Sequence, residues 1–317
     1  MNRNDVAWSG YWPAAPTPFT VTGALDGAAL ASLVELYARH RVNGVLINGS
    51  TGEWFSQTLD ERREVARIAV ETVAGRFPVV IGVTAYTPDE SIALARHAEQ
   101  IGADGALATP PPYVHPSPDE IVAFYRAVSS ATSLPFMVYN WPRGVAVDMG
   151  ATPGLFHRLA ELDRVVAIKD STGNWLGMLD TVEQLSPEVR VFGSFLHRRG
   201  LAVLQNIGGD GNIDGGGIGA PFAVPYYQAA FAGDRGAASM WADKYQLLSG
   251  KLIRPDYSGV FASPIPQLKA VMSILGQPGG HVRAPLLPFS GDFAALERVV
   301  AESGIAEAAQ GAGALDV

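Results

Sequence analysis

The segment VVAIKDSTGN, residues 165–174, gives the strongest indication of both fold and chemistry in this chain. Val165 to Ile168 form a run of β-branched and small apolar residues, which is typical of a buried strand. Lys169 and Asp170 follow at once, and Ser-Thr-Gly then indicates a loop. The segment therefore predicts a buried strand that ends in a lysine, with an apolar environment behind the amine and a loop in front of it.

Runs of the same kind recur along the chain and alternate with amphipathic stretches. Continuously apolar strands favour a parallel sheet that is covered on both faces. We expect strands at residues 42–47, 78–83, 104–108, 135–140, 165–170, 189–193 and 211–214, with another inside 10–19. Eight strands that alternate with helices close naturally into a (β/α)8 TIM barrel. An open, doubly wound sheet is the alternative.

Helices are expected between the strands, over 59–75, 89–102 and 117–131 among others, where apolar residues recur at helical spacing. Thr58 and Glu61 form the pattern of a capping box ahead of the first of these helices. After residue 235 the strand pattern fades and helical periodicity continues. We therefore expect a single catalytic unit, with a barrel over 8–232, C-terminal helices over 233–309 and a loose tail over 310–317.

The composition argues against several classes of function. The chain has 317 residues and a formal net charge of −8, without the basic cluster that a nucleic-acid partner requires. It contains no cysteine, which excludes disulfides, thiolate nucleophiles and cysteine-ligated metals. No apolar run approaches the roughly 18 residues needed to cross a bilayer, and the first residues lack a signal-peptide pattern. We expect a cytoplasmic protein with no membrane or nucleic-acid partner.

Lys169 is the candidate nucleophile. In a barrel of this kind, catalytic residues lie on the loops at the carboxyl ends of the strands. An ordinary lysine is protonated at neutral pH, but burial disfavours the charged form. A neutral amine attacks a ketone to form an imine, which withdraws electrons from the neighbouring carbon. The alternative is a lysine that ends a strand and pairs with Asp170, a commoner arrangement than catalysis.

Two further strand ends carry hydroxyl groups. NGSTGE, 48–53, places Ser50 and Thr51 between glycines, in a turn whose N–H and hydroxyl groups can hold a carboxylate. Tyr139 ends the run FMVYN, where a phenol can pass a proton to a substrate. Each has an ordinary alternative, a helix-capping turn for the first and a core tyrosine for the second. Their occurrence with Lys169 at strand ends of one barrel favours a common site.

With these residues in place, the sequence resembles the dihydrodipicolinate synthase/N-acetylneuraminate lyase family of pyruvate-type lysine aldolases. Five motifs carry the resemblance by their order and spacing: PTPF (16–19), GSTGE (49–53), VYN-P (138–142), IKDSTG (168–173) and GGDGNI (208–213). The resemblance implies a (β/α)8 barrel with C-terminal helices, assembled as a homotetramer that is a dimer of dimers. It implies a 2-oxo acid substrate, no cofactor and no catalytic metal. The six histidines agree, because they show no metal-ligand spacing.

The resemblance also assigns roles to individual residues. It implies that Lys169 forms the Schiff base and that Tyr139 relays protons. Ser50 and Thr51 match the hydroxyl pair that holds the keto-acid carboxylate and links to that tyrosine. Tyr113, in TPPPYVHP, matches an interface tyrosine that is lent to the relay of the neighbouring subunit.

Other matches concern the substrate. Ile213 matches a residue whose backbone carbonyl faces the pyruvate end, and Gly193 is expected to contact substrate at the end of the seventh strand. Arg143, in WPRGV, stands one position before the arginine with which family synthases grip a second carboxylate, and we include it among the substrate-binding residues. Where family members carry acidic residues, this chain has Ser194, Phe195 and Leu196, so we expect a less polar cavity.

The expected function is that of a Schiff-base-forming lyase acting on pyruvate or another 2-oxo acid. The reaction is aldol cleavage or condensation, or dehydration of a keto-deoxy acid, since GEWFS (52–56) is similar to GEFFS of keto-deoxy-glucarate dehydratases. One alternative is a 4-hydroxy-tetrahydrodipicolinate synthase, and another is a small-molecule-binding barrel without catalysis. An oxidoreductase is a third, because GGGIGA (215–220) is a variant of a dinucleotide fingerprint, although it comes late in the chain.

Overall fold

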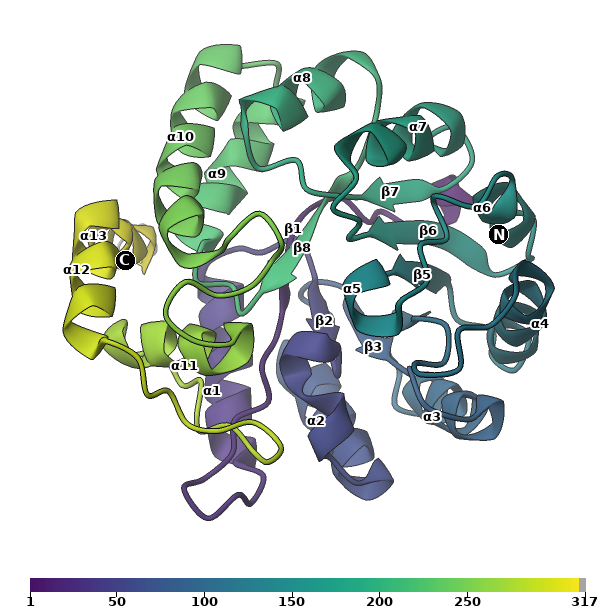
Figure 1. The fold of residues 1–317 in the computed structure, drawn as a ribbon, viewed down its shortest axis with the longest axis horizontal. Coiled ribbons are helices and arrows are strands. Elements are labelled where there is room, and N and C mark those ends of the chain that lie inside the picture. The colour runs from purple at the N-terminus through teal and green to yellow at the C-terminus, as the bar shows by residue number, and fades with distance from the viewer. Residues whose placement is uncertain (314–317) are drawn as a thin grey trace.

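Eight parallel strands close on one another in chain order in the structure, a computed structural model that describes residues 1–313 (Figure 1). The last strand pairs with the first, Gly211 to Gly215 against Gly10 to Ala14. This pairing closes the sheet, so the expected (β/α)8 barrel is confirmed and the open sheet is excluded. The strands are β1 (Gly10–Ala14), β2 (Val45–Ile47), β3 (Val79–Gly82), β4 (Gly105–Ala108), β5 (Phe136–Asn140), β6 (Val165–Asp170), β7 (Arg190–Phe192) and β8 (Gly211–Gly215).

Helices follow each strand and surround the barrel (Figure 1). They are α1 (Gly27–Arg39), α2 (Leu59–Val73), α3 (Pro88–Gln100), α4 (Pro118–Ser129), α5 (Pro142–Val145), α6 (Leu155–Ala160), α7 (Trp175–Leu185), α8 (Arg198–Asn206) and α9 (Ala220–Phe231). Short 3-10 turns occur at η1 (Arg3–Asp5), η2 (Ser50–Gly52) and η3 (Trp54–Ser56). Within the described residues, no helix has both the length and the apolar character needed to span a bilayer.

Capping fixes where two of these helices begin. The N–H of Glu61 donates to Oγ1 of Thr58 (3.2 Å), and the N–H of Thr58 donates to Oε2 of Glu61 (2.9 Å). This is the predicted capping box of α2, and Ser117 and Glu120 form a second one at the start of α4. Such caps satisfy N–H groups that have no partner within the helix.

Four more helices form the C-terminal extension, which lies against one side of the barrel in Figure 1. They are α10 (Arg235–Leu252), α11 (Pro264–Ile274), α12 (Phe293–Ser303) and α13 (Ile305–Gly313). The expected border at 232/233 falls between α9 and α10. The tail expected to be loose over 310–317 overlaps the end of α13, which continues to Gly313. Residues 314–317 lie outside the described residues.

Alternate residues of the strands build two apolar layers. Trp12 and Phe192 point into the barrel and meet edge-on, with 5.4 Å between ring centres. Tyr11, one residue earlier on β1, points outward into the layer between strands and helices. Successive strand side chains point to opposite faces. The same alternation at the end of β8 places Ile213 inside the barrel and Asp214 outside, beside Tyr11.

A buried ion pair fixes the C-terminal extension to the barrel. Glu53, in the GSTGE loop, is fully buried and lies 2.6 Å from Nζ of Lys269 on α11. Lys269 also donates to the carbonyl oxygens of Thr17 (2.8 Å) and His281 (2.6 Å). Burial lowers the pKa of Lys269, and the charge of Glu53 opposes this shift. Because a buried charge without a partner costs several kcal/mol, the pair holds α11 against the loop that carries the predicted hydroxyl pair.

Replacement of Lys269 by methionine is expected to lower the free energy of unfolding by about 3–5 kcal/mol, because Glu53 stays buried without its partner. Denaturation in guanidinium chloride measures this loss. The matched control is Lys251→Met, which removes an exposed ion pair with Glu302 (2.6 Å) and should leave the midpoint nearly unchanged. Equal losses in the two variants would contradict the role given to the buried pair.

Candidate active site

Lys169 and Tyr139 lie side by side at the carboxyl-end rim of the barrel. The parallel register of β5 and β6 pairs Tyr139 with Lys169 and Asn140 with Asp170. Nζ of Lys169 lies 3.7 Å from the ring centre of Tyr139. The two residues are only 6% and 5% exposed, respectively. The amine therefore lies over an aromatic face in a largely dehydrated environment, with the phenol beside it.

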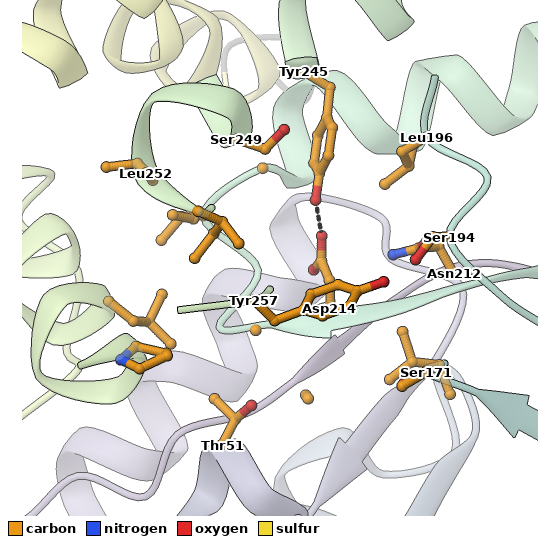
Figure 2. Close-up of a pocket in the computed structure, with 18 of the residues that line it drawn as sticks. Thr51, Ser171, Ser194, Leu196, Asn212, Asp214, Tyr245, Ser249, Leu252 and Tyr257 are labelled. Atoms are coloured by element: carbon orange, nitrogen blue, oxygen red, sulfur yellow. Dashed lines mark hydrogen bonds between the residues drawn. The ribbon is translucent and has the colours of Figure 1, made fainter. Parts of the chain in front are cut away.

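The two side chains line a cavity of about 440 Å³ at the mouth of the barrel. Six of the eight predicted site residues line this cavity. The wall includes Lys169, Tyr139, Ser50, Thr51, Gly193 and Ile213, and it does not include Tyr113 or Arg143. Figure 2 shows Ser171, Ser194 and Asn212 on one side of this cavity, Thr51 below them, and the ring of Tyr257 in the middle of the view.

The hydroxyl pair is presented by a tight turn between β2 and α2. Ser50 and Thr51 begin the 3-10 turn η2, and Asn48, just before it, has a positive φ of 56°. The amide of Asn48 donates to the carbonyl of Arg62 on α2 (2.8 Å) and so anchors the turn. The turn also lies close against β3, where a Cβ on Gly82 would come within 2.3 Å of the Asn48 carbonyl oxygen. Backbone packing thus fixes the two hydroxyl groups at the rim.

Asp170 does not serve as the partner of Lys169. Its Oδ1 accepts hydrogen bonds from Nδ2 of Asn140 (2.9 Å) and from the N–H of Thr172 (3.1 Å). Burial raises the pKa of this carboxyl to about 6, although these hydrogen bonds oppose the shift. Within the described part of the chain, no ion pair joins Lys169 to Asp170. The strand-end ion pair that was the ordinary alternative for Lys169 is therefore not formed.

Asp214 is a further carboxyl group in the cavity wall. Its Oδ1 accepts a hydrogen bond from the phenol of Tyr11 (2.5 Å), and its Oδ2 accepts one from Tyr245 on α10 (Figure 2). Burial raises the pKa of Asp214 from 3.8 to about 6, against the opposing effects of the two phenols and the charge of Lys169. Burial also raises the pKa of Tyr11 and Tyr245, so both phenols remain protonated donors.

Sequence patterns predict no role for Tyr245 and place Asp214 only at the end of a strand. A usable signal is present on α10, where residues at helical spacing, i, i+3, i+4 and i+7, share one face. That face carries Tyr245, Leu248, Ser249 and Leu252, and all four line the cavity. Tyr245 and Ser249 are polar residues between leucines on this face, which indicates that the face lines a cavity and is not packed entirely into the core.

Tyr113 lies away from the cavity of its own chain. It follows β4 in the loop before α4, has a positive φ of 81° and is 88% exposed. A tyrosine this exposed makes little contact with its own chain. Its role in the site of a neighbouring subunit stays a prediction.

Arg143 also lies outside the cavity wall. It is exposed on α5, and its guanidinium donates a hydrogen bond to the carbonyl oxygen of Tyr257. Tyr257 itself lines the cavity, and its phenol donates to the carbonyl of Thr172 (3.3 Å). Arg143 therefore braces the loop at the cavity mouth in this structure, and its contact with substrate stays a prediction.

Some aromatic residues near the site pack in the protein interior, and others line the cavity. Phe195 is fully buried and packs in the core, and Trp54 contacts Arg62 and Tyr86 outside the cavity. Trp141 lines the cavity and stacks on Tyr139, with 6.0 Å between ring centres and 13° between ring planes. This stacking fixes the orientation of the Tyr139 ring beside Lys169.

Neither a metal cluster nor a dinucleotide loop accounts for the cavity. Among the described residues, no group of three or more His, Cys, Asp and Glu side chains is arranged to hold a metal ion. GGGIGA (215–220) follows the eighth strand, whereas a dinucleotide fingerprint follows the first strand of its fold. Its place in the fold therefore gives no support to an oxidoreductase.

The sequence model of the Dihydrodipicolinate synthetase family matches residues 7–301. The chain belongs to this family. An uncharacterized DapA-like lyase of Rhizobium meliloti is 33% identical over 289 residues, covering 89% of this chain and 91% of its own. A 4-hydroxy-tetrahydrodipicolinate synthase of an Azoarcus species is also 33% identical, over 87% of this chain and 91% of its own.

A solved structure of a dihydrodipicolinate synthase is also similar to this chain. Dihydrodipicolinate synthase from Acinetobacter baumannii, crystallised with pyruvate, is 26% identical, with a TM-score of 0.81 over 94% of this chain and 99% of its own. The family predicted from the five motifs is therefore confirmed, and so is the expected enzyme class, a lyase of the dihydrodipicolinate synthetase family.

The raised pKa of Asp214 predicts a pH-dependent stability. The pKa of this carboxyl group is about 6 in the folded protein and 3.8 in the unfolded chain. The unfolded chain therefore loses the proton first as the pH rises, and the free energy of unfolding falls between these two pKa values. Relative to Asp214→Asn, the wild type should lose up to about 3 kcal/mol between pH 4 and pH 6.5, measured by urea denaturation. Asp170 titrates in both proteins, so its contribution cancels in the difference.

Asp180→Asn, on the exposed face of α7, is the matched control and should follow the pH profile of the wild type. If Asp214→Asn also follows that profile, Asp214 does not have the raised pKa.

Proposed function

We propose that the chain is a Schiff-base-forming lyase that makes or breaks a carbon–carbon bond in a 2-oxo acid, with Lys169 as the nucleophile. The observation that carries this proposal is the position of Nζ of Lys169, 3.7 Å from the Tyr139 ring centre in the wall of the cavity. Pyruvate is the proposed 2-oxo acid, because the Acinetobacter baumannii relative was crystallised with it.

In the proposed reaction, the amine of Lys169 adds to the carbonyl carbon of the keto acid, and the carbonyl oxygen leaves as water. Loss of a proton from the next carbon converts the imine to an enamine. In the condensing direction, the enamine carbon bonds to an aldehyde carbon, and the aldehyde oxygen takes up a proton. Water then hydrolyses the imine and frees Lys169, and the cleavage direction reverses these steps. Dehydration of a keto-deoxy acid begins with the same imine and releases a proton and a hydroxyl group as water.

Tyr139, Ser50 and Thr51 complete the proposed site. A proton carrier must lie within reach of the atoms that exchange protons, and the register of β5 and β6 places Tyr139 directly beside Lys169. Ser50 and Thr51 would receive the keto-acid carboxylate on the opposite wall, where Thr51 faces the cavity in Figure 2. Ile213 and Gly193 would border the bound keto acid.

We also propose a homotetramer in which Tyr113 completes the proton relay of a neighbouring subunit. The side chain of Tyr113 is exposed and does not line the cavity of its own chain, which supports this assignment. The expected absence of a cofactor and the expected cytoplasmic location remain predictions.

A 4-hydroxy-tetrahydrodipicolinate synthase, which condenses pyruvate with an aldehyde, is the second candidate. The name of the Azoarcus relative favours it. The position of Arg143 argues against it, because its guanidinium is bonded to the Tyr257 carbonyl and does not line the cavity. A second substrate carboxylate would then lack the arginine that the resemblance leads one to expect.

Reduction by borohydride in the presence of pyruvate is expected to attach the three-carbon unit to Lys169, because the reagent converts the imine to a stable amine. Mass spectrometry of the digested protein locates the adduct. Lys169→Ala should give none, whereas Lys244→Ala, which removes an exposed lysine of α10, should label as the wild type does. Absence of an adduct in the wild type, or its presence on another lysine, would overturn the proposal.

Tyr139→Phe should keep the imine and lose proton transfer. We expect the exchange of pyruvate methyl protons with deuterium oxide, followed by NMR, to slow by about 10²–10⁴-fold, the usual contribution of a general acid–base group. Borohydride labelling of Lys169 should persist. A variant that exchanges at the wild-type rate would show that another group carries the proton.

A further inference from the structure

The cavity extends well beyond the space that a three-carbon keto acid requires. Its volume of about 440 Å³ lies in the range of sites that hold drug-sized ligands. Lys169, Tyr139 and Thr51 mark its barrel end, and the rest of it lies beneath α10 and α11. We call this second part the side chamber, which is lined by Asp214, Tyr245, Leu248, Ser249, Leu252 and Leu268. Figure 2 shows Thr51 on one side and Ser249 and Leu252 on the other.

The walls of the side chamber are mainly aliphatic. Leu248 and Leu252 come from α10 and Leu268 from α11, and neighbouring isoleucines at 218, 253 and 265 extend the same surface. Burial of an apolar group against such walls favours binding by about fourfold for each methylene. The chamber therefore suits a carbon chain better than a strongly hydrated group.

The charges that line the whole cavity are unfavourable to a second anion. Among the described residues that line the cavity, Lys169 is the only lysine or arginine, and its amine would be consumed in the imine. Asp170 and Asp214 are both acidic. His197 also lines the cavity, and burial lowers its pKa, so it is neutral at pH 7. A carboxylate on the distal part of a substrate would meet no cation in the described wall, and an unpaired charge in such a site is costly.

Asp214 lines this chamber, and two phenols hold its carboxyl group. The phenols of Tyr11 and Tyr245 donate to its two oxygens, one to each. A carboxylate has about four acceptor positions, so two remain after these bonds. The remaining positions accept a neutral donor such as a hydroxyl group and repel another carboxylate.

We propose that the part of the substrate beyond the keto-acid group is uncharged and largely aliphatic, that it occupies the side chamber, and that Asp214 excludes a second carboxylate there. This inference rests on the proposed function for the position of the keto-acid group at Lys169. It makes Asp214 a specificity-determining residue and places the aldehyde fragment of the aldol product between β8 and α10.

Two 2-oxo acids of equal chain length test the proposal on the full-length protein. 2-Oxohexanoate ends in a methyl group, and 2-oxoadipate carries a carboxylate at the same place. Isothermal titration calorimetry is expected to show 2-oxohexanoate binding about tenfold more tightly than pyruvate and about 30-fold more tightly than 2-oxoadipate. Equal affinities of the two six-carbon acids, or tighter binding of 2-oxoadipate, would overturn the proposal, as would failure of 2-oxohexanoate to bind.

Variants of residues that line the side chamber test whether Asp214 causes the weaker binding of 2-oxoadipate. Asp214→Asn should bind 2-oxoadipate about tenfold more tightly, because the repulsion is removed, and should change 2-oxohexanoate binding less than about threefold. Ser249→Lys adds a cation to the same wall and should also favour 2-oxoadipate. Asp180→Asn, on the surface of α7, should alter neither affinity. An unchanged preference in both Asp214→Asn and Ser249→Lys would overturn the assignment to the side chamber.

Borohydride labelling with the same acids separates this inference from the proposed function. If 2-oxohexanoate is preferred but no acid labels Lys169, the side chamber holds an uncharged chain and the Schiff-base proposal fails. If pyruvate labels Lys169 and the two six-carbon acids bind equally, the lyase proposal stands and the inference about the chamber fails.

Discussion

The parallel register of β5 and β6 is the constraint on which the candidate site depends. It sets Tyr139 beside Lys169 and Asn140 beside Asp170, on neighbouring strands that end at one rim. Asn140 binds the Asp170 carboxyl, which leaves the Lys169 amine over the Tyr139 ring without a carboxylate partner from its own strand. A shift of one residue would turn these side chains to the opposite face of the sheet. The chemistry at the rim therefore follows from strand pairing in the closed barrel.

The C-terminal extension completes the cavity that the barrel begins. Two buried polar contacts fix it in place, Glu53 with Lys269 on α11 and Asp214 with Tyr245 on α10. Both acidic residues lie in loops or strand ends next to the site, so the same contacts that dock the extension also order the rim. Buried polar groups need partners, and their partners here come from helices that supply the outer wall of the cavity.

Much of the fold could be predicted from the sequence, because buried parallel strands have an unmistakable pattern. β6 begins and ends at the predicted residues, and the other strands lie within or overlap their predicted ranges. The capping box of Thr58 and Glu61 could be predicted as well, because the two residues are only three positions apart in the sequence. Lys169, Tyr139, Ser50 and Thr51 were identified for the same reason, since each stands at the end of a recognisable strand and strand ends of a barrel converge.

The barrel, its rim and the residues that the strands present there can thus be predicted from the sequence, because they follow from local periodicity and from the closure of eight parallel strands. The residues across the cavity, in contrast, depend on contacts between segments that are far apart in the sequence. Asp214 meets Tyr11 and Tyr245, which are 203 and 31 residues away, and no spacing rule connects them. Phe195 and Arg143 stand beside site residues in the sequence, yet one packs in the core and the other binds a loop carbonyl. Long-range packing, which depends on how the helices dock, selects these partners and so shapes the cavity.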